Sequence, residues 1–381
     1  MIEMKKNKCY GCGACSSACP ESCIQMKEDR EGFLYPYVDK ERCISCGLCK
    51  EVCPSLLEEN LKEDKEVVSP FAVGGFHKDK RILESSSSGG AFTLFANEII
   101  RRGGLVYGCA MDKNLMAVHT GVSSVRDLDK LKKSKYMQST AGGVFHEIKK
   151  VLYEGKEVLF TGTPCECAGL EAFLGKTYNN LYLCDFVCHG VPSRRIFRDW
   201  INYQETRYHD KIVDVLFRIK KFGWNSSGLQ MGTKTTFLKR VKWRIPALTD
   251  PYMNGFLENI CLRPSCYCCL FKGKRLHSDI TMADFWGIKK IDKSFANKNG
   301  MSLILLNTQN GKELFRQVKN NFEYKEYDWK RALSHNKSYF ESAEQNPKRN
   351  NFFADYWERG IAYVIKKYLM PWHWIKYRLF R

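Results

Sequence analysis

The sequence has no long apolar run. No stretch of its 381 residues approaches the roughly 18 apolar residues of a membrane-spanning helix. The opening residues, MIEMKKNKC, contain no apolar core of a secretory signal, so we expect a cytoplasmic protein. There is also no zinc-finger spacing, no RNP-type motif and no isolated basic helix after a turn, which argues against a nucleic-acid partner.

Acidic residues are scarce, with 42 Asp and Glu against 61 Lys and Arg, and the net charge is +19. The imbalance is uneven, because residues 1–66 hold ten basic and thirteen acidic side chains and the positive excess lies in the remainder. A basic body favours anionic partners such as dinucleotide phosphates, lipid head groups or phosphorylated substrates.

Cysteine, in contrast, is abundant, with 18 residues. In an intracellular protein this points to metal or redox centres instead of a disulfide scaffold. Exposed clusters also suggest an anaerobic, low-oxygen habitat. The first 57 residues contain an internal repeat, in which C-x2-C-x2-C-x3-C-P occurs at 9–20 and again at 43–54.

This repeat is typical of a dicluster ferredoxin with two [4Fe–4S] clusters. Three cysteines of each run bind one cluster, and the cysteine before proline binds the other cluster. One predicted ligand set is Cys9, Cys12, Cys15 and Cys53, and the other is Cys43, Cys46, Cys49 and Cys19. Zinc also accepts four thiolates, but it does not call for the crossed pattern. Cys23 falls outside both runs and is interpreted as a small buried side chain.

The rest of the chain indicates an α/β body. After an N-terminal ferredoxin-type (α+β) domain over 1–57 and a charged linker over 58–70, apolar periodicity alternates between strand and helix, which predicts parallel strands. Predicted strands are 71–77, 104–111, 157–163, 181–188, 212–219, 279–287 and 302–307. Predicted helices are 89–102, 142–154, 193–206, 311–320 and 352–369.

Two stretches of the body have the sequence features of ligand-binding loops. ESSSSGGAF (84–92) runs into a helix N-terminus, which suits a phosphate, although a Ser/Gly run is more often a turn with an N-cap. VLFTGTPCECAGL (158–170) is a strand, a tight turn and a helix start, and ligand loops in α/β folds sit at such strand ends.

Together with GGLVYGCA, KSKYMQS, CHGVPS and CLRPSCYCCLFKGKRLHSDITMADFWG, these words resemble the coenzyme F420 hydrogenase/dehydrogenase beta-subunit family in its bacterial form with a fused dicluster ferredoxin. The resemblance runs to about residue 310. It divides the body at 71–155 and 156–345. It implies a flavin-binding α/β body with FAD beside a further [4Fe–4S] cluster.

The resemblance also implies site residues. The pyrophosphate and ring of the flavin would be held by Ser86, Ser87, Ser88, Gly89, Gly90, Gln138, Thr161, Gly162 and Thr163. Lys135 would place a positive charge near the flavin. His189 would protonate the flavin or a substrate, although a supporting or structural role is the favoured interpretation.

The late cysteines would form the third cluster site. Cys266 and Cys269 make a two-corner chelate, and Cys165 and Cys188 are the preferred other ligands. Cys261 competes for one place, and zinc is the alternative metal. Cys184 and Cys268 are expected to lie outside the ligand set.

Two positions depart from the family words. Ala283 stands where glycine is expected before Asp284, and Glu166 stands where glutamine is expected. An unpaired Glu166 would repel a reduced, anionic flavin. The aromatic and basic end over 346–381, and 366–381 in particular, suits either a membrane surface or a packed helix with a frayed end.

The sequence therefore predicts an iron–sulfur flavoprotein oxidoreductase. Electrons would pass between a redox partner protein or ferredoxin, the clusters, FAD and an organic hydride acceptor such as coenzyme F420. The alternative is a non-catalytic electron-transfer subunit of a multi-subunit reductase.

Overall fold

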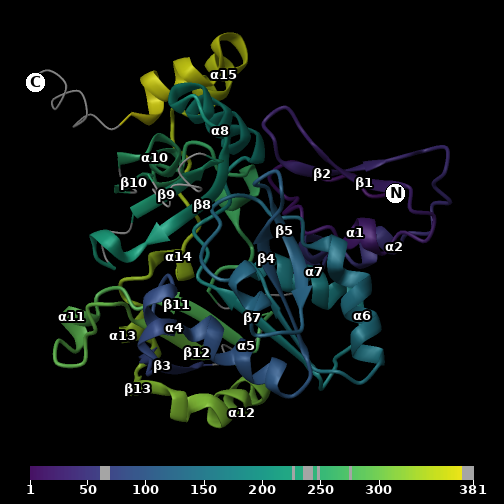
Figure 1. Ribbon diagram of the computed structural model, residues 1–381. Helices are drawn as coiled ribbons and strands as arrows, with labels where there is room; N and C mark the ends of the chain where they lie inside the picture. The colour runs from purple at the N-terminus through teal and green to yellow at the C-terminus, as the bar shows by residue number, and fades with distance from the viewer. Residues whose placement is uncertain (61–68, 225–227, 235–242, 247–248, 274–276, 371–381) are drawn as a thin grey trace, which may run out of the picture.

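The computed structural model describes residues 1–60, 69–224, 228–234, 243–246, 249–273 and 277–370. A small N-terminal unit lies beside a larger α/β body, next to the helices labelled α6 and α7 (Figure 1). Within the described ranges, no helix combines the length and apolar character needed to cross a membrane.

The N-terminal unit repeats one local design. Its elements are α1 (Ala14–Ser17), β1 (Ile24–Glu28), β2 (Leu34–Val38), α2 (Leu48–Glu51) and α3 (Pro54–Asn60). The strands β1 and β2 pair antiparallel. Gly13 and Gly47, one in each cysteine run, cap α1 and α2 with positive φ of 85° and 87°, a conformation that glycine adopts without steric cost. The predicted linker overlaps the end of α3, and its residues 61–68 lie outside the described part of the chain.

The body is built on an eight-stranded mixed sheet. In spatial order the strands are β13 (Phe322–Tyr327), β3 (Phe71–His77), β12 (Ser302–Leu306), β11 (Ile280–Asp284), β7 (Leu181–Phe186), β6 (Val158–Thr161), β4 (Leu105–Met111) and β5 (Ala117–Val122). The α/β class is confirmed. The prediction of parallel strands holds only for the central strands β11, β7, β6 and β4. The strands on either side of them pair antiparallel.

Helices cover both faces of this sheet, so the central strands are apolar on both sides. Strand β6 illustrates this, since Leu159 packs in the same cluster as α5 and α12, whereas Val158 and Phe160 pack in the cluster of α6 and α7. The helices around the sheet are α4 (Lys80–Ser85), α5 (Ala91–Arg101), α6 (Phe145–Tyr153), α7 (Pro164–Leu174) and α12 (Gln309–Val318). Shorter helices are α11 (Ile288–Ile291), α13 (Trp329–Leu333) and α14 (Lys337–Phe340).

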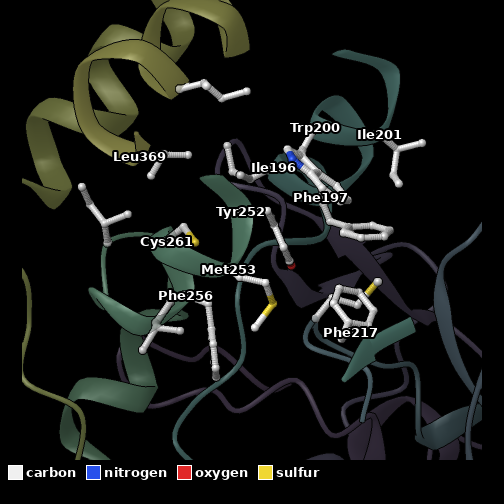
Figure 2. Packing of buried hydrophobic residues seen from close by; sticks show 14 of the residues in the cluster. Ile196, Phe197, Trp200, Ile201, Phe217, Tyr252, Met253, Phe256, Cys261 and Leu369 are labelled. Atoms are coloured by element: carbon white, nitrogen blue, oxygen red, sulfur yellow. The ribbon is translucent and has the colours of Figure 1, made fainter. Parts of the chain in front are cut away.

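A second module sits above the sheet in Figure 1. Its elements are α8 (Arg194–Tyr208), β8 (Ile212–Ile219), β9 (Gly228–Thr233), β10 (Trp243–Pro246), α10 (Pro251–Leu257), α15 (Arg349–Val364) and the π-helical turn η7 (Ile365–Leu369). Figure 2 shows its core, where Trp200 of α8, Phe217 of β8 and Tyr252 of α10 surround one interior.

The end of the chain joins that core. The predicted helix over 352–369 corresponds to α15 and η7, with a break at Gly360 (φ 76°). Ile365 and Leu369 are each 1% exposed, so the first residues of the predicted tail pack into the protein as the helix alternative requires. Residues 371–381, where most of the predicted membrane contact falls, lie outside the described ranges. The strands β1, β2, β5, β9, β10 and β13 have no counterpart among the predicted strands.

Candidate redox sites

The cysteines of the N-terminal repeat surround two separate pockets. Four buried thiols line the inner pocket: Cys9, Cys12, Cys15 and Cys53. The outer pocket is lined by Cys19, Cys43, Cys46 and Cys49. The structure therefore brings together both crossed sets that the spacing predicts. The outer pocket is nearer to solvent, because Cys46 is exposed.

Cys23 is buried, as expected, but it also lines the outer pocket. Its Sγ lies 3.3 Å from Sγ of Cys19. Sequence reasoning missed this placement because Cys23 belongs to neither run.

A third group of thiols lies in the body, where several loops meet. Cys165 is in the first turn of α7, Cys188 follows β7, and Cys266 and Cys269 belong to and follow the 3-10 turn η5 (Pro264–Cys268). All four line one pocket, as the resemblance implies. Burial raises the pKa of the Cys266 thiol to about 11 and that of Cys188 to about 12. Such thiols stay protonated at neutral pH unless a metal or cluster takes up the charge.

The other late cysteines lie elsewhere. Cys261 is 1% exposed in the core of the second module, near Tyr252 and Met253 (Figure 2), and does not line the third pocket. Cys184 is buried in the core between the sheet and α5, and Cys268 is exposed. Among the described residues, no three His, Cys, Asp or Glu side chains are grouped closely enough to hold a single metal ion.

Two residues connect the inner pocket to the third pocket. Tyr10 lines both, its hydroxyl accepts a hydrogen bond from the amide of Leu270 (2.9 Å), and its ring packs edge-on against Phe271. Arg263 lines the third pocket and donates from Nε to the carbonyl oxygen of Cys9 (2.8 Å). The sequence word CLRPSC thus supplies a contact to the N-terminal unit as well as a thiol.

A large cavity of about 820 Å³ opens beside the third pocket. The predicted residues that line it are Ser86, Ser87, Ser88, Gly90, Lys135, Thr161, Gly162, Thr163 and His189. Cys188 and His189 line both the cavity and the third pocket, so the two spaces share a wall. Lys133 also lines the cavity, as does Lys132, which pairs with Asp129 (2.8 Å).

Two predicted residues do not line this cavity. Gly89 is packed against β3 and the start of β12, where its amide donates to Oγ of Ser302 (2.9 Å). Gln138 is 3% exposed and turns toward the N-terminal unit, where its Oε1 accepts from the amide of Leu34 (3.0 Å) and from Arg263 (3.1 Å). Neither residue therefore lies where a ligand bound in this cavity would contact it.

Lys135 has an unusual environment for a lysine. Burial lowers its pKa to about 8, while its Nζ donates to the carbonyl oxygens of Lys130 (3.2 Å) and Lys132 (2.7 Å). Neutral acceptors do not balance its charge, so the ammonium group can release a proton near physiological pH.

His189 is held by hydrogen bonds on both ring nitrogens. Nε2 donates to Oδ1 of Asn259 (2.5 Å), which leaves Nδ1 to accept from Oγ of Ser338 (3.3 Å). Burial lowers its pKa, so the ring is neutral at pH 7. A fixed, neutral imidazole between the two spaces fits the supporting role better than that of an acid.

Glu166 lines the cavity and keeps its negative charge, which in addition to burial helps to raise the pKa of the neighbouring Cys165 thiol. It forms a capping box at the start of α7, where its Oε2 accepts from the amide of Thr163 (2.8 Å). The positive end of a helix dipole stabilises a carboxylate at this place. The glutamate that replaces the expected glutamine is thus held in place by the capping box of α7.

Sequence reasoning missed a polar group on the cavity wall. His119 faces Cys109 across the β4–β5 ladder, and both line the cavity. Its Nε2 donates to the carbonyl oxygen of Thr161 (3.0 Å), and its Nδ1 accepts from Oγ of Ser139 (2.5 Å). Only the unpredicted strand β5 brings His119 here, so no signal in the sequence pointed to it.

The second module is tied to the cavity by one carboxylate. Asp284, after Ala283 on β11, pairs with Arg218 of β8 (2.5 Å) and accepts from Nε1 of Trp224 (3.1 Å). The ring of Trp224 stacks on that of Trp286, which lines the cavity. Residues of the ADFWG motif therefore form the part of the cavity wall where the second module meets the main sheet.

Comparison with protein-family models matches residues 155–330 to the C terminus of the coenzyme F420 hydrogenase/dehydrogenase beta subunit. Residues 8–56 match a 4Fe-4S dicluster domain, and residues 38–79 match a 4Fe-4S single cluster domain of Ferredoxin I. The matched residues 155–330 contain the third group of thiols and part of the cavity lining, so the family resemblance of the sequence is confirmed over this part of the chain. The dicluster match precedes it, so the chain combines iron–sulfur cluster sequences with a segment similar to an oxidoreductase subunit.

Among solved structures, one similar chain comes from the F420-reducing [NiFe] hydrogenase complex of Methanosarcina barkeri. It is 16% identical, with a TM-score of 0.46 over 80% of this chain and 93% of that chain. No curated protein matches the sequence.

Proposed function

We propose that this protein is an iron–sulfur flavoprotein oxidoreductase that passes electrons between a partner protein and an organic hydride acceptor. The observation that carries the proposal is a succession of three sites, from the inner pocket through the third pocket to the large cavity. The inner and third pockets share Tyr10, and the third pocket and the large cavity share Cys188 and His189. Helix α7 adds a further contact, since Gly169 packs against Sγ of Cys12 while Cys165 lies in its first turn.

The thiol sets fit [4Fe–4S] clusters. Each predicted set of four sulfurs converges on one pocket, and soft thiolates are the ligands that iron–sulfur clusters take. The third cluster would be held by Cys165, Cys188, Cys266 and Cys269. These four ligands are partly buried, so the third cluster would have limited contact with solvent.

The large cavity fits FAD. At the start of α5 the lining includes Gly90, whose positive φ of 92° turns the chain into the helix, followed by Ala91, Phe92 and Thr93. The amides at this helix start suit a pyrophosphate, together with Lys133 and with Lys132, which also pairs with Asp129 (2.8 Å). When bound, a flavin would couple one-electron supply to two-electron hydride chemistry.

The chain's own residues would assist that chemistry at named atoms. Nζ of Lys135 would hold a positive charge at the cavity below about pH 8 and release it above. His189 would keep the wall between the third pocket and the cavity in one orientation through Asn259 and Ser338. The acceptor, coenzyme F420 or another organic molecule, would enter the same cavity.

Electrons would enter or leave at the outer pocket. Cys46 is exposed there, and the neighbouring Ile44 (63% exposed) and Leu48 (39% exposed) offer apolar surface to a redox partner protein or ferredoxin.

The decisive experiment is the flavin content of protein purified without oxygen. We expect close to one FAD per chain after denaturation. Replacing Ser87, which lines the cavity, by Glu should reduce that content because a carboxylate repels the pyrophosphate. The matched S85E variant, changed at an exposed position outside the cavity, should retain FAD. Absence of FAD from the wild-type protein, even after incubation with FAD, would leave a non-catalytic electron-transfer subunit as the better account.

A further inference from the structure

The outer pocket has one thiol more than a [4Fe–4S] cluster requires. Five cysteines line it: Cys19, Cys23, Cys43, Cys46 and Cys49. Cys23 is 3% exposed and lies with Sγ 3.3 Å from Sγ of Cys19. At that separation the two sulfurs occupy adjacent positions on the same pocket wall.

The backbone brings Cys23 to this place. The amide of Ser22 donates to the carbonyl oxygen of Cys19 (3.1 Å), and Ser22 has a positive φ of 48°. The carbonyl of Cys23 then accepts from the amide of Asp39 (2.9 Å), which anchors the residue beside β1. A left-handed conformation at a non-glycine residue is sterically unfavourable, so the turn is maintained by the surrounding structure.

The internal repeat shows that ferredoxin geometry does not demand this thiol. The position equivalent to Cys23, four residues after the cysteine that precedes proline, is Leu57 in the second run. Within the described residues, the inner pocket is accordingly lined by four thiols and no fifth. The additional sulfur is therefore specific to the pocket that is open to solvent through Cys46.

We propose that Cys23 is an alternative ligand of the outer cluster that can replace Cys19. In the exchange, the iron–sulfur bond to Cys19 breaks and a bond to Cys23 forms. The proton of the Cys23 thiol passes to the Cys19 thiolate, and no electron is gained or lost. The exchange keeps the most exposed cluster coordinated when its Cys19 corner is lost. This inference rests on the ligand sets given under the proposed function.

The test compares iron and acid-labile sulfide per chain, together with the EPR spectrum of the reduced protein, in anaerobically purified variants. We expect C19A to retain the wild-type content with an altered outer-cluster signal, and C19A/C23A to lose one cluster's worth of iron. The matched control is C53A, which changes the equivalent cysteine of the repeat. Because Leu57 and not a cysteine stands four residues after Cys53, this single change should already cause the loss of a cluster. Equal losses in C19A and C19A/C23A would overturn the proposal.

The control separates this failure from that of the ligand sets. If C53A and C46A both retain full iron, the assigned sets are wrong. If C53A and C46A lose iron, the assigned ligand sets are supported. If C19A then loses as much iron as C19A/C23A, only the exchange between Cys19 and Cys23 is refuted.

A second variant covers the case in which C19A fails to fold. In C23A all four assigned ligands remain, so we expect wild-type iron content without oxygen. In air with an iron chelator present, C23A should release its outer-cluster iron several-fold faster than the wild-type protein. Release at the wild-type rate, or loss of the outer cluster already during anaerobic purification, would contradict the role of Cys23 as the replacement ligand.

Discussion

The guanidinium of Arg263 and the carbonyl of Cys9 are joined by a 2.8 Å hydrogen bond across 254 residues of sequence. Arg263 is 1% exposed, and its other contacts are the oxygens of Leu34 (2.9 Å) and Gln138 (3.1 Å) and the ring of Tyr35. None of the ion pairs found among the described residues gives it a carboxylate partner. A buried charge without a counter-ion is costly, and thiolate-bound clusters on either side would supply the negative charge.

Replacing Arg263 by Met should therefore lower the reduction potential of the inner cluster, since the reduced cluster carries one more negative charge. R263K keeps the positive charge but not the planar guanidinium group, so it should shift the reduction potential less. An EPR-monitored redox titration measures both. The same potential in R263M and the wild-type protein would show that Arg263 is purely structural. Loss of its hydrogen bonds should also destabilise the fold by about 1–3 kcal/mol.

Removing Cys188 should abolish the third cluster. We expect C188A to lose one cluster's worth of iron and the C261A control to keep it, because Cys261 lies in the second module's core. Iron analysis and EPR of the reduced protein distinguish them. Iron loss in C261A with retention in C188A would reverse the assignment.

Protonation of His277 should hold α3 to the body. Burial opposes its charge, but the hydrogen bond to Glu171 (2.6 Å) and the ion pair with Glu58 (2.8 Å) outweigh this and raise the pKa to about 9. Because the folded-state pKa lies above the ordinary value of about 6.5, the stabilisation is complete below pH 6.5 and is lost as pH rises through about 9. Its size is roughly 2–3 kcal/mol.

The thermal midpoint of the anaerobic protein, at fixed scan rate, should thus fall between pH 7 and pH 10 more in the wild-type protein than in H277Q. E58Q should mimic H277Q more closely than E171Q does, because Glu58 is 2% exposed and the side chain of Glu171 is 57% exposed. Parallel curves for H277Q and the wild-type protein would refute the clamp.

Lys135 should make the flavin potential depend on pH. Below its pKa of about 8 the ammonium group stabilises a reduced, anionic flavin, and this help disappears at higher pH. The flavin midpoint potential should consequently drop between pH 7 and pH 9 by more in the wild-type protein than in K135Q. K130Q, changed at an exposed lysine outside the cavity lining, should behave as wild type. A K135Q profile identical to that of K130Q would remove Lys135 from the site.

Local patterns predicted the fold well where the chain is regular. Strand β3 coincides with the predicted 71–77, and the cysteine spacings placed both crossed sets at their pockets. The sequence could not predict contacts that depend on distant segments. Gln138 lies within a family word, yet it faces Leu34 because the N-terminal unit covers it. The edge strands β5 and β13 have mixed polar sequences, which carry a weak periodicity signal.

The contacts beneath the N-terminal unit also determine how it can move. Glu28 pairs with Arg198 (2.9 Å), Glu31 with Arg349 (3.1 Å) and Glu58 with His277, while Arg263 reaches Cys9. These attachments come from four separate segments of the body and hold the N-terminal unit at several points. In the proposed function the unit would thus act as a fixed relay and not as a swinging carrier. Electron transfer inside the protein should be independent of solvent viscosity, and diffusion should limit only the encounter with a partner.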